Sequence, residues 1–338
     1  MNTAVSPAAT RSRMWAIVNN QYGSPDDLKL QEIDKPTVGD DAVLIRVAAA
    51  SVNPYDWHVM RGVPYLIRLL RGLRRPKSSL FGADVAGHVE TVGKNVTHVQ
   101  PGDEVFGWGD GTFAEYVCVD ESSCLHKPNR LTFEQAAAVP LAGCTALQAL
   151  RDGGRLQQGN SVLINGASGG VGTFAVQIAR ALGAEVTGVS STRNVDLVRS
   201  IGANHVVDYT VENFTLSGER YDLILDLIAN HSLSAFNRVL KPHGTLVLAG
   251  GGAGRWLGPL ARPLKAIVLS RFYSQGCVAF LASLKKEDGV FLSELIEAGR
   301  VTPVIDRTYR LSEAPEAIRY LEAGHARGKV VITMTGQT

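Results

Sequence analysis

Apolar residues recur in short runs along the first 140 or so residues, a pattern that predicts β-strands. The run at 42–52 (AVLIRVAAASV) is almost wholly apolar and suits a buried strand, whereas 84–92 and 114–119 alternate in short pieces. Turn signals separate these runs, among them Pro-Gly-Asp at 101–103 and Gly-Asp-Gly at 109–111. This part of the chain is therefore predicted to form an antiparallel, barrel-like β domain.

From about residue 138 the rhythm changes to strand, helix, strand. A short apolar run at 161–166 precedes a helical stripe in which Val171, Phe174, Ile178 and Leu182 share one face. Further apolar runs lie at 184–190, 205–209, 221–228, 244–252 and 276–282. Six short strands with helical segments between several of them predict an α/β domain with a parallel, doubly wound sheet.

The end of the chain carries two helical patterns, at 290–299 and 313–324, and a closing strand at 328–334. We assign this end to the β domain. The expected organisation is a disordered tail at 1–13, a β domain at 14–137 and 284–338, and an α/β domain at 138–283. The tail has no acidic residue, so a mitochondrial presequence is the alternative reading of it.

Composition narrows the class of protein. The chain has 338 residues, 45% of them hydrophobic, and a net charge of +2, which indicates a soluble globular protein and does not suggest a nucleic-acid binder. Its four cysteines (Cys118, Cys124, Cys144, Cys277) form no CxxC pair, which argues against a disulfide framework or zinc knuckle and favours the reducing cytoplasm. No apolar run reaches the ~18 residues of a membrane span.

A glycine-rich turn lies between the predicted strand at 161–166 and the helix that follows. The stretch NGASGGVG (165–172) contains Ala167-x-Gly169-x-x-Gly172, which is the Rossmann fingerprint with alanine at its first position. Such a turn brings backbone N–H groups close to a pyrophosphate at a helix N-terminus. A tight turn without a ligand is the alternative. The candidate cofactor-binding residues here are Ala167, Ser168, Gly169, Gly170, Val171 and Gly172.

The end of the second strand of this domain indicates which dinucleotide binds. NAD-binding proteins usually place an acid there to hold the ribose 2′-hydroxyl. This chain has Ser190, Ser191, Thr192, Arg193 and Asn194 instead, which can bind a 2′-phosphate without repelling it. We therefore expect NADPH, held by Ser190, Ser191, Arg193 and Asn194. Thr192 or Asn194 can equally cap a helix, and both roles can hold at once.

Other motifs extend over nearly the whole chain, from Trp15 to Thr333. They are SVNPYDW (51–57), GADVAGHVETVGKNV (82–96), PGDEVFG (101–107), GCTALQAL (143–150), NGASGGVG (165–172) and ARGKVVI (326–332). With them the chain resembles the medium-chain dehydrogenase/reductase superfamily, and within it the zinc-free quinone oxidoreductases of the zeta-crystallin type. The resemblance implies a GroES-like β-barrel catalytic domain joined to a Rossmann NADP(H)-binding domain.

The resemblance also bears on metal. Zinc alcohol dehydrogenases begin the glycine frame with Gly-His-Glu, and the histidine ligates zinc; here the frame begins Gly82-Ala83-Asp84. The region of the usual cysteine ligand holds Ser51-Val52-Asn53. A catalytic zinc needs three protein ligands, so we expect none, and we expect His88 to be a hydrogen-bonded core residue. An enzyme without a Lewis acid needs an acceptor already activated for hydride, such as a quinone or an α,β-unsaturated carbonyl.

Candidate catalytic residues lie at 53–62 (NPYDWHVMRG). The resemblance places Asn53 beside the nicotinamide and substrate. Five residues on, where relatives often have tyrosine or lysine, stands His58, so the proton donor is His58, Tyr55 or water. The resemblance places Thr145 near the nicotinamide, Tyr209 against the adenosine and Lys329 near the cofactor cleft. Asn230 and Gly250, Gly251 and Gly252 follow strands at their carboxyl ends, where cofactors bind.

Two segments combine basic and apolar residues. The segment 61–77 carries six basic residues and no acid, and the segment 255–272 lies in a long acid-free region. They suit either an anionic membrane surface or the lining of a cleft for a bulky apolar acceptor. By resemblance, a homodimer would form through the edge strand near 276–282.

The leading hypothesis is an NADPH-dependent, zinc-independent oxidoreductase that reduces a quinone or an α,β-unsaturated carbonyl. One rival is a zinc-free carbonyl reductase or alcohol dehydrogenase on the same fold. A second rival is an NADPH-binding structural or scaffold protein with little turnover.

Overall fold

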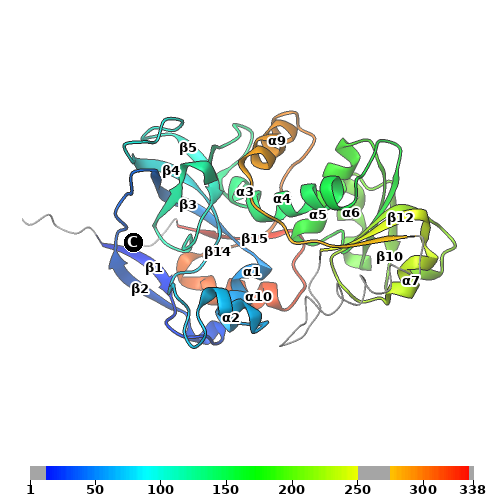
Figure 1. The fold of residues 1–338 in the computed structure, drawn as a ribbon, viewed down its shortest axis with the longest axis horizontal. Coiled ribbons are helices and arrows are strands. Elements are labelled where there is room, and N and C mark those ends of the chain that lie inside the picture. The colour runs from blue at the N-terminus through cyan, green and yellow to red at the C-terminus, as the bar shows by residue number, and fades with distance from the viewer. Residues whose placement is uncertain (1–12, 250–274, 335–338) are drawn as a thin grey trace, which may run out of the picture.

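The computed structural model describes residues 13–249 and 275–334 (Figure 1). Gly250, Gly251, Gly252 and the basic segment 255–272 lie outside the described residues, as does 1–12 of the expected tail. Arg13, which we assigned to that tail, is instead the first residue of strand β1. Figure 1 shows two lobes, one built on the barrel-like strands and the other on the parallel sheet.

The first lobe contains two sheets. Strands β1 and β2 form an antiparallel pair, and the larger sheet has the order β14-β15-β3-β4-β5-β7, with β6 paired to β3. All its pairs are antiparallel except β14 with β15. Alternate residues of β3, among them Val43, Ile45 and Val47, point into a valine-rich core. The strands are β1 (Arg13–Val18), β2 (Lys29–Asp34), β3 (Ala42–Val52), β4 (Asp84–Val92), β5 (Glu104–Trp108), β6 (Tyr116–Asp120), β7 (Cys124–His126), β14 (Ile305–Arg310) and β15 (Lys329–Thr333).

The second lobe is a six-stranded sheet with the order β10-β9-β8-β11-β12-β13, and every pair in it is parallel. The six predicted strands are therefore confirmed, and their carboxyl ends lie along one edge of the sheet. They are β8 (Ser161–Asn165), β9 (Glu185–Ser190), β10 (His205–Asp208), β11 (Tyr221–Asp226), β12 (Leu240–Leu248) and β13 (Gly276–Ala279). The helices between them are α5 (Gly170–Ala181), α6 (Val195–Ser200) and α7 (Leu233–Arg238).

The remaining helices connect or cover the sheets. Two of them, α1 and α2, interrupt a region that we expected to be mostly strand. They are α1 (Pro54–Arg61), α2 (Leu66–Arg71), α3 (Phe133–Ala137), α4 (Pro140–Gln148), α9 (Lys286–Glu297) and α10 (Ala314–Glu322). The end of the chain returns to the first lobe, because β15 pairs with β3. The sequence analysis missed β14. The boundaries between the β domain and the α/β domain, as given in the sequence analysis, stay a prediction.

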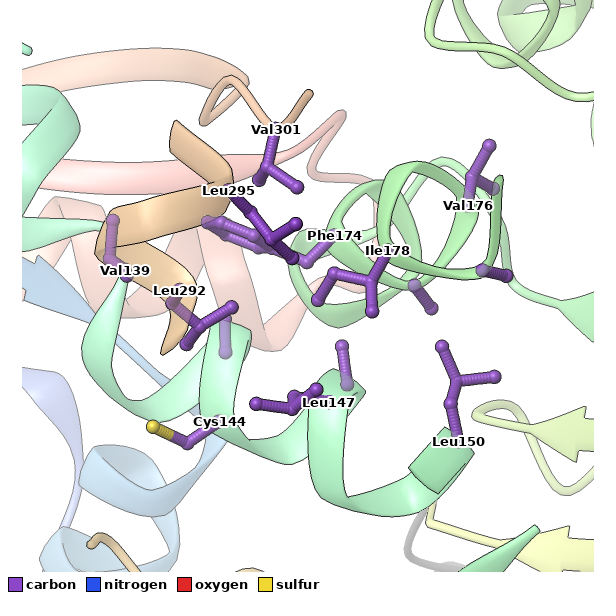
Figure 2. Packing of buried hydrophobic residues seen from close by; sticks show 14 of the residues in the cluster. Val139, Cys144, Leu147, Leu150, Phe174, Val176, Ile178, Leu292, Leu295 and Val301 are labelled. Atoms are coloured by element: carbon purple, nitrogen blue, oxygen red, sulfur yellow. The ribbon is translucent and has the colours of Figure 1, made fainter. Parts of the chain in front are cut away.

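The two lobes share one hydrophobic core. Figure 2 shows Leu292 and Leu295 of α9 directed toward α4 and α5, where Leu147, Phe174 and Ile178 are buried. The same core includes residues of both sheets, such as Phe106 of β5 and Val162 of β8. Burial of large aliphatic side chains across this junction, at ~1.5–3 kcal/mol each, holds the glycine-rich turn at 165–172 against the barrel. Within the described ranges, no helix has the length and apolar character needed to cross a bilayer.

Candidate functional site

The turn between β8 and α5 is shaped by two glycines. Gly166 has a φ of +94°, which L-residues with side chains rarely adopt. A Cβ added to Gly172 would lie 2.1 Å from the carbonyl oxygen of Gly166, so no larger residue fits there. Gly169 is the N-cap of α5, and a Cβ on it would meet nothing closer than 3.5 Å. The open helix N-terminus beside Gly169, with no acidic residue in its first turn, fits a dinucleotide pyrophosphate.

Polar residues at the end of β9 gather around Asn194. The buried Nδ2 of Asn194 donates to Oγ of Ser168 at 3.0 Å and to Oγ of Ser191 at 3.3 Å. These hydrogen bonds join the end of β9 to the glycine-rich turn between β8 and α5. Ser190 is buried, and its Oγ donates to the carbonyl oxygen of Ser191 at 3.4 Å. Arg193 is exposed, and its guanidinium donates to the carbonyl oxygen of His325 at 3.0 Å.

A carboxylate that the sequence analysis did not consider lies beside this cluster. Asp208 ends β10, and it pairs in register with Ser190. Hydrogen bonds from the side chains of Thr192 and Thr210 lower the pKa of Asp208, so it is ionised at neutral pH. The acid therefore sits on the neighbouring strand rather than at the end of β9, and its oxygens are already engaged by the two threonines.

Tyr209 and Asn230 come together at one cavity of about 350 Å³. Its lining also includes Phe214 and His231, whose rings lie 4.8 Å apart. Tyr209 is 57% exposed, so its ring face is accessible to a flat ligand. Oδ1 of Asn230 accepts from Nδ2 of Asn165 at 2.9 Å, which ties the cavity to the end of β8. Thr145 lies on α4, and its hydroxyl donates to the carbonyl oxygen of Leu141 at 2.6 Å.

A buried polar cluster lies between the barrel and the nucleotide turn. Nδ2 of Asn53 donates to Oδ2 of Asp84 at 2.9 Å and to the carbonyl oxygen of Ser51 at 3.2 Å. Oδ1 of Asn53 accepts from Nζ of Lys329 at 2.5 Å. The hydroxyl of Ser51 donates to Asp84 at 2.7 Å. Both amide hydrogens of Asn53 thus have partners inside the protein, so Asn53 has no free donor for a substrate oxyanion in this arrangement.

The charges of this cluster are unusual for a protein interior. Lys329 is 3% exposed, and its Nζ lies 3.8 Å from Oδ2 of the fully buried Asp84. Burial raises the pKa of Asp84 and lowers the pKa of Lys329, while the attraction between the two opposes both shifts. Burial also raises the pKa of Asp56 to about 8, against a hydrogen bond from the backbone N–H of Asn53. Asp56 is therefore mostly protonated at neutral pH.

Lys329 connects this cluster to the nucleotide turn. Its Cδ lies 3.1 Å from where a Cβ of Gly170 would stand, and Gly328 forms a parallel bridge with Gly169. The lysine is thus near the cofactor turn through its aliphatic chain, while its ammonium group points into the barrel. The sequence alone does not show that the ammonium group of Lys329 points into the barrel.

His58 and Tyr55 both lie on α1, but their partners differ. Nδ1 of His58 lies 2.7 Å from the carbonyl oxygen of Val63, so Nδ1 carries the proton, and the ring stacks on Trp57. Burial lowers the pKa of His58, which leaves it neutral with its one proton engaged. The hydroxyl of Tyr55 accepts a hydrogen bond from Arg71, whose guanidinium also contacts Asp110 at 2.9 and 3.0 Å. The phenol hydrogen of Tyr55 is thus left for a ligand.

The metal-site residues stand as follows. Ala83 has no ligating atom, and Ser51 is engaged by Asp84. Among residues 13–249 and 275–334, no group of three or more His, Cys, Asp and Glu side chains is arranged to hold a metal ion. His88 departs from expectation: its side chain is 34% exposed, its Nδ1 has no hydrogen-bond partner, and it packs beside Phe133 rather than in the core.

Several residues of the site were not predicted. Asp56, Arg71, Asp110 and Asp208 make contacts that decide the geometry, yet only Asp56 had a local signal. It stands three residues after Asn53, where an acid closes a capping box at a helix start. The others contact their partners through the fold alone.

Comparisons with known proteins agree with this arrangement. Residues 39–129 match the family described as the alcohol dehydrogenase GroES-like domain, and residues 201–332 match the family described as zinc-binding dehydrogenase. The chain is 37% identical to the mitochondrial NAD(P)H oxidoreductase RTN4IP1 of Mus musculus, over 98% of this chain and 92% of the mouse protein. It is 34% identical to the chloroplastic NADPH-dependent alkenal/one oxidoreductase of Arabidopsis thaliana, over 96% of this chain and 81% of that protein.

A solved structure supports the same assignment. The quinone oxidoreductase of Coxiella burnetii aligns with a TM-score of 0.83 and 31% identity, over 96% of this chain and all of that chain. The GroES-like lobe and the Rossmann-type parallel sheet are therefore both confirmed. The chain belongs to the medium-chain dehydrogenase/reductase family, in its zinc-free, quinone oxidoreductase-like branch.

Proposed function

We propose that the protein is an NADPH-dependent oxidoreductase that reduces a quinone or an α,β-unsaturated carbonyl without a metal ion. One observation carries the proposal: the open N-terminus of α5 at Gly169 lies against Lys329, whose ammonium group belongs to the buried cluster of Asn53 and Asp84. A dinucleotide held at that turn would have its reactive end beside a polar, water-poor pocket. The names of the relatives from mouse, Arabidopsis and Coxiella point to the same chemistry.

The residues fit NADPH. The first turn of α5, which begins at Gly170, has backbone N–H groups without acceptors inside the helix for a pyrophosphate, and Ser168, Ser191 and Asn194 form a hydroxyl-rich site for a 2′-phosphate. The cavity between Tyr209 and Asn230 suits the adenine end. Bound NADPH would supply a hydride from its nicotinamide ring to the acceptor. The rest of the reaction depends on the chain's own side chains.

The residues do not fit a catalytic zinc. Ala83 stands at the histidine position, and the nearby carboxylate of Asp84 is neutralised by Lys329 at 3.8 Å. An ammonium group at this point would repel a divalent cation. Without strong polarisation of a carbonyl, the acceptor must delocalise the charge that develops when hydride arrives. Quinones and α,β-unsaturated carbonyls do so through conjugation.

Tyr55 is the proton donor in this proposal. Its O–H gives a proton to the reduced acceptor, and the phenolate that forms is stabilised by the guanidinium of Arg71. Asp110 holds that guanidinium in place, and water returns the proton. Asn53 acts by positioning Lys329 and Asp84 rather than by touching the acceptor. His58 supports α1 through Val63 and Trp57.

We also propose contact with an anionic membrane surface through α2. Leu66, Leu69 and Leu70 are exposed and share one face of α2, and Leu73, which is also exposed, follows the end of the helix. Arg74, Arg75 and Lys77 lie beside them, exposed to solvent. A protein of the cytoplasm that binds a bilayer in this way would take its apolar acceptor from the lipid. A homodimer through β13 is proposed too, because β13 is an edge strand of the described sheet.

The test of the function is a panel of acceptors with NADPH: a quinone, an enone, an unactivated ketone and an aldehyde. We expect the first two to be reduced and the others to react slowly. Preference for the ketone would support a carbonyl reductase instead. Binding of NADPH without turnover of any acceptor would support a scaffold protein.

A further inference from the structure

We propose that the buried amide of Asn194 sets the direction of the Ser168 and Ser191 hydroxyls, and that it thereby selects between a 2′-phosphate and a 2′-hydroxyl on the adenosine ribose. The inference rests on the proposed binding of NADPH and adds to it a residue that determines specificity. Asn194 acts through the two serines, so it is a positioning residue.

The argument begins with an unsatisfied atom. Asn194 is 5% exposed, its Nδ2 donates to both serine oxygens, and its Oδ1 is buried without a hydrogen-bond partner among the described residues. A buried polar atom without a partner destabilises the folded state. Such an unpartnered atom calls for an explanation other than stability.

The second step concerns the serine hydroxyls. Each hydroxyl has one hydrogen to donate and lone pairs to accept. Because Nδ2 of Asn194 donates to both, neither serine spends its hydrogen on Asn194. Ser168 and Ser191 are only half-buried, so both hydrogens can point toward a ligand. A phosphate has acceptor oxygens alone when ionised, so this polarity suits a 2′-phosphate.

The third step is the reverse orientation. Turning the Asn194 amide over would place Oδ1 where Nδ2 now stands, and both serines would then donate to it. Their lone pairs would face the ligand and accept from a ribose hydroxyl. The orientation found here, with Nδ2 toward both serines, is therefore the one that favours a 2′-phosphate over a 2′-hydroxyl.

The charged side chains near the end of β9 have partners outside the cluster of Asn194, Ser168 and Ser191. Arg193 is directed to the carbonyl oxygen of His325, and Asp208 is engaged by Thr192 and Thr210. The neutral cluster of Asn194, Ser168 and Ser191 is the link between the end of β9 and the glycine-rich turn.

The experiment uses ligands that differ only at the ribose 2′ position. Calorimetry would measure Kd for adenosine 2′,5′-bisphosphate, adenosine 5′-monophosphate and its 2′-deoxy form. For the wild type we expect the bisphosphate to bind at least ~10-fold tighter than the monophosphate, which corresponds to about 1.4 kcal/mol. Failure of the wild type to bind either nucleotide would refute the proposed function itself, whereas the variants below test the inference.

Asn194→Asp can only accept, so it forces both serines to donate inward. We expect it to lose the preference for the bisphosphate and to gain one for the 2′-hydroxyl over the 2′-deoxy ligand, by about 5-fold. The added charge of the aspartate does not affect the ratio of the Kd values for adenosine 5′-monophosphate and its 2′-deoxy form, because both ligands carry the same charge. Asn204→Asp is the matched control: Asn204 lies in the same lobe, its Oδ1 accepts from the N–H of Val186, and both ratios should stay as in the wild type.

Two further variants separate the mechanism from direct contact. Asn194→Ala frees the serines to turn either way, so we expect an intermediate preference for the bisphosphate. Adding Ser168→Ala and Ser191→Ala to Asn194→Asp should abolish the gained preference for the 2′-hydroxyl. A gained preference that survives without the serines would overturn the inference, as would wild-type ratios in folded Asn194→Asp. If Asn194→Asp does not fold, Ser168→Ala with Ser191→Ala alone must lose the bisphosphate preference, and its retention would equally overturn the inference.

Discussion

Tyr55 and His58 stand three residues apart on α1, and their hydrogen bonds assign them different roles. We predict that Tyr55→Phe lowers kcat for an enone by ~10²-fold, as loss of a proton donor typically does, with little change in the Kd of NADPH. Quinone reduction should fall less, because a quinol anion can take its proton from water later. Steady-state kinetics with both acceptor classes, and fluorescence titration of NADPH, provide the measurement.

His58→Phe is the control for that prediction. Since the Nδ1 proton of His58 is held by the carbonyl of Val63 and burial lowers its pKa, the variant should keep kcat for enones within about 3-fold of the wild type. A large loss, together with the disappearance of an ionisation from the pH–rate profile, would make His58 the donor and contradict the assignment of Tyr55.

Asp56 gives the fold a dependence on pH. Its pKa is raised to about 8 in the folded chain, above the ~3.9 of an unfolded aspartate. The folded state therefore binds the proton more tightly, and the stability that this proton provides is present below about pH 4 and lost as the pH rises toward 8. The slope reaches at most ~1.4 kcal/mol per pH unit.

The variant Asp56→Asn should remove this slope, because an amide oxygen can still accept from the backbone N–H of Asn53. We expect its free energy of unfolding, measured by urea titration at pH 5, 6.5 and 8, to fall less with pH than that of the wild type. Parallel curves for the two proteins would mean that Asp56 is ionised in the folded state.

The sequence predicted single residues where a local motif carries them and missed those that depend on distant contacts. Gly169, Gly172 and Ser191 could be proposed as site residues because the fingerprint and the strand end are each contiguous in sequence. The partners of Asn53 are 31 and 276 residues away, on β4 and β15. Periodicity reports which residues share a face of one element, but it does not pair side chains of different elements. The amide of Asn53 therefore looked free in the sequence and is occupied in the fold.

At the scale of elements, the turn into α5 separates a glycine that the fold needs from one that the ligand needs. A Cβ at position 172 would stand 2.1 Å from the carbonyl oxygen of Gly166, whereas one at position 169 meets nothing within 3.4 Å. We predict that Gly172→Ala lowers the thermal midpoint markedly, since backbone must move. Gly169→Ala should keep that midpoint and weaken NADPH binding. Calorimetric unfolding and titration on both variants test this; equal destabilisation by the two would contradict it.

Elements with a strong hydrophobic pattern were predicted, and elements without one were not. Strands β8, β9 and β11 of the parallel sheet are largely buried on both faces and read as apolar runs, as central parallel strands do. Strand β14 (IDRTYR) is exposed or half-buried at every position, so its sequence shows neither an apolar run nor clean alternation. Strand β14 is held in the sheet by its pairing with β15, and this tertiary contact is not visible in the local sequence.

Helix α2 makes a prediction of its own. Leu70 is 75% exposed and Leu69 is 62% exposed, so replacing both with serine removes apolar surface without opening a cavity. We expect Leu69→Ser with Leu70→Ser to reduce binding to phosphatidylglycerol vesicles severalfold, measured by flotation, while NADPH binding is kept. Leu216→Ser is the control, because Leu216 is 71% exposed on the other lobe. Wild-type protein that binds charged and neutral vesicles equally weakly would rule out the membrane role.

At the scale of the whole molecule, the return of the chain end creates the site. Strand β15 pairs with β3 of the barrel, and α9 packs on α4 and α5 (Figure 2). This topology places Lys329 between the nucleotide turn and Asp84, although the two sheets are built from separate stretches of sequence. The assignment of the end of the chain to the barrel followed from its pattern, but the ion pair that results did not.

That ion pair leads to a prediction about metal for the molecule as a whole. The buried carboxylate of Asp84 is compensated by the ammonium of Lys329, 3.8 Å away, rather than by a metal ion. A metal that bound the folded chain would stabilise it by mass action, so its removal would lower the thermal midpoint. We expect exhaustive dialysis against a chelator to leave the midpoint within about 1 °C and quinone reduction intact, with less than stoichiometric zinc by metal analysis. Activity that returns only when zinc is added would show that other residues supply the ligands that Ala83 and Ser51 lack. Lys329→Met would then show whether the ammonium of Lys329 or a zinc ion compensates the charge of Asp84. If the ammonium does, the variant leaves Asp84 without a compensating charge, and folding or turnover should be impaired.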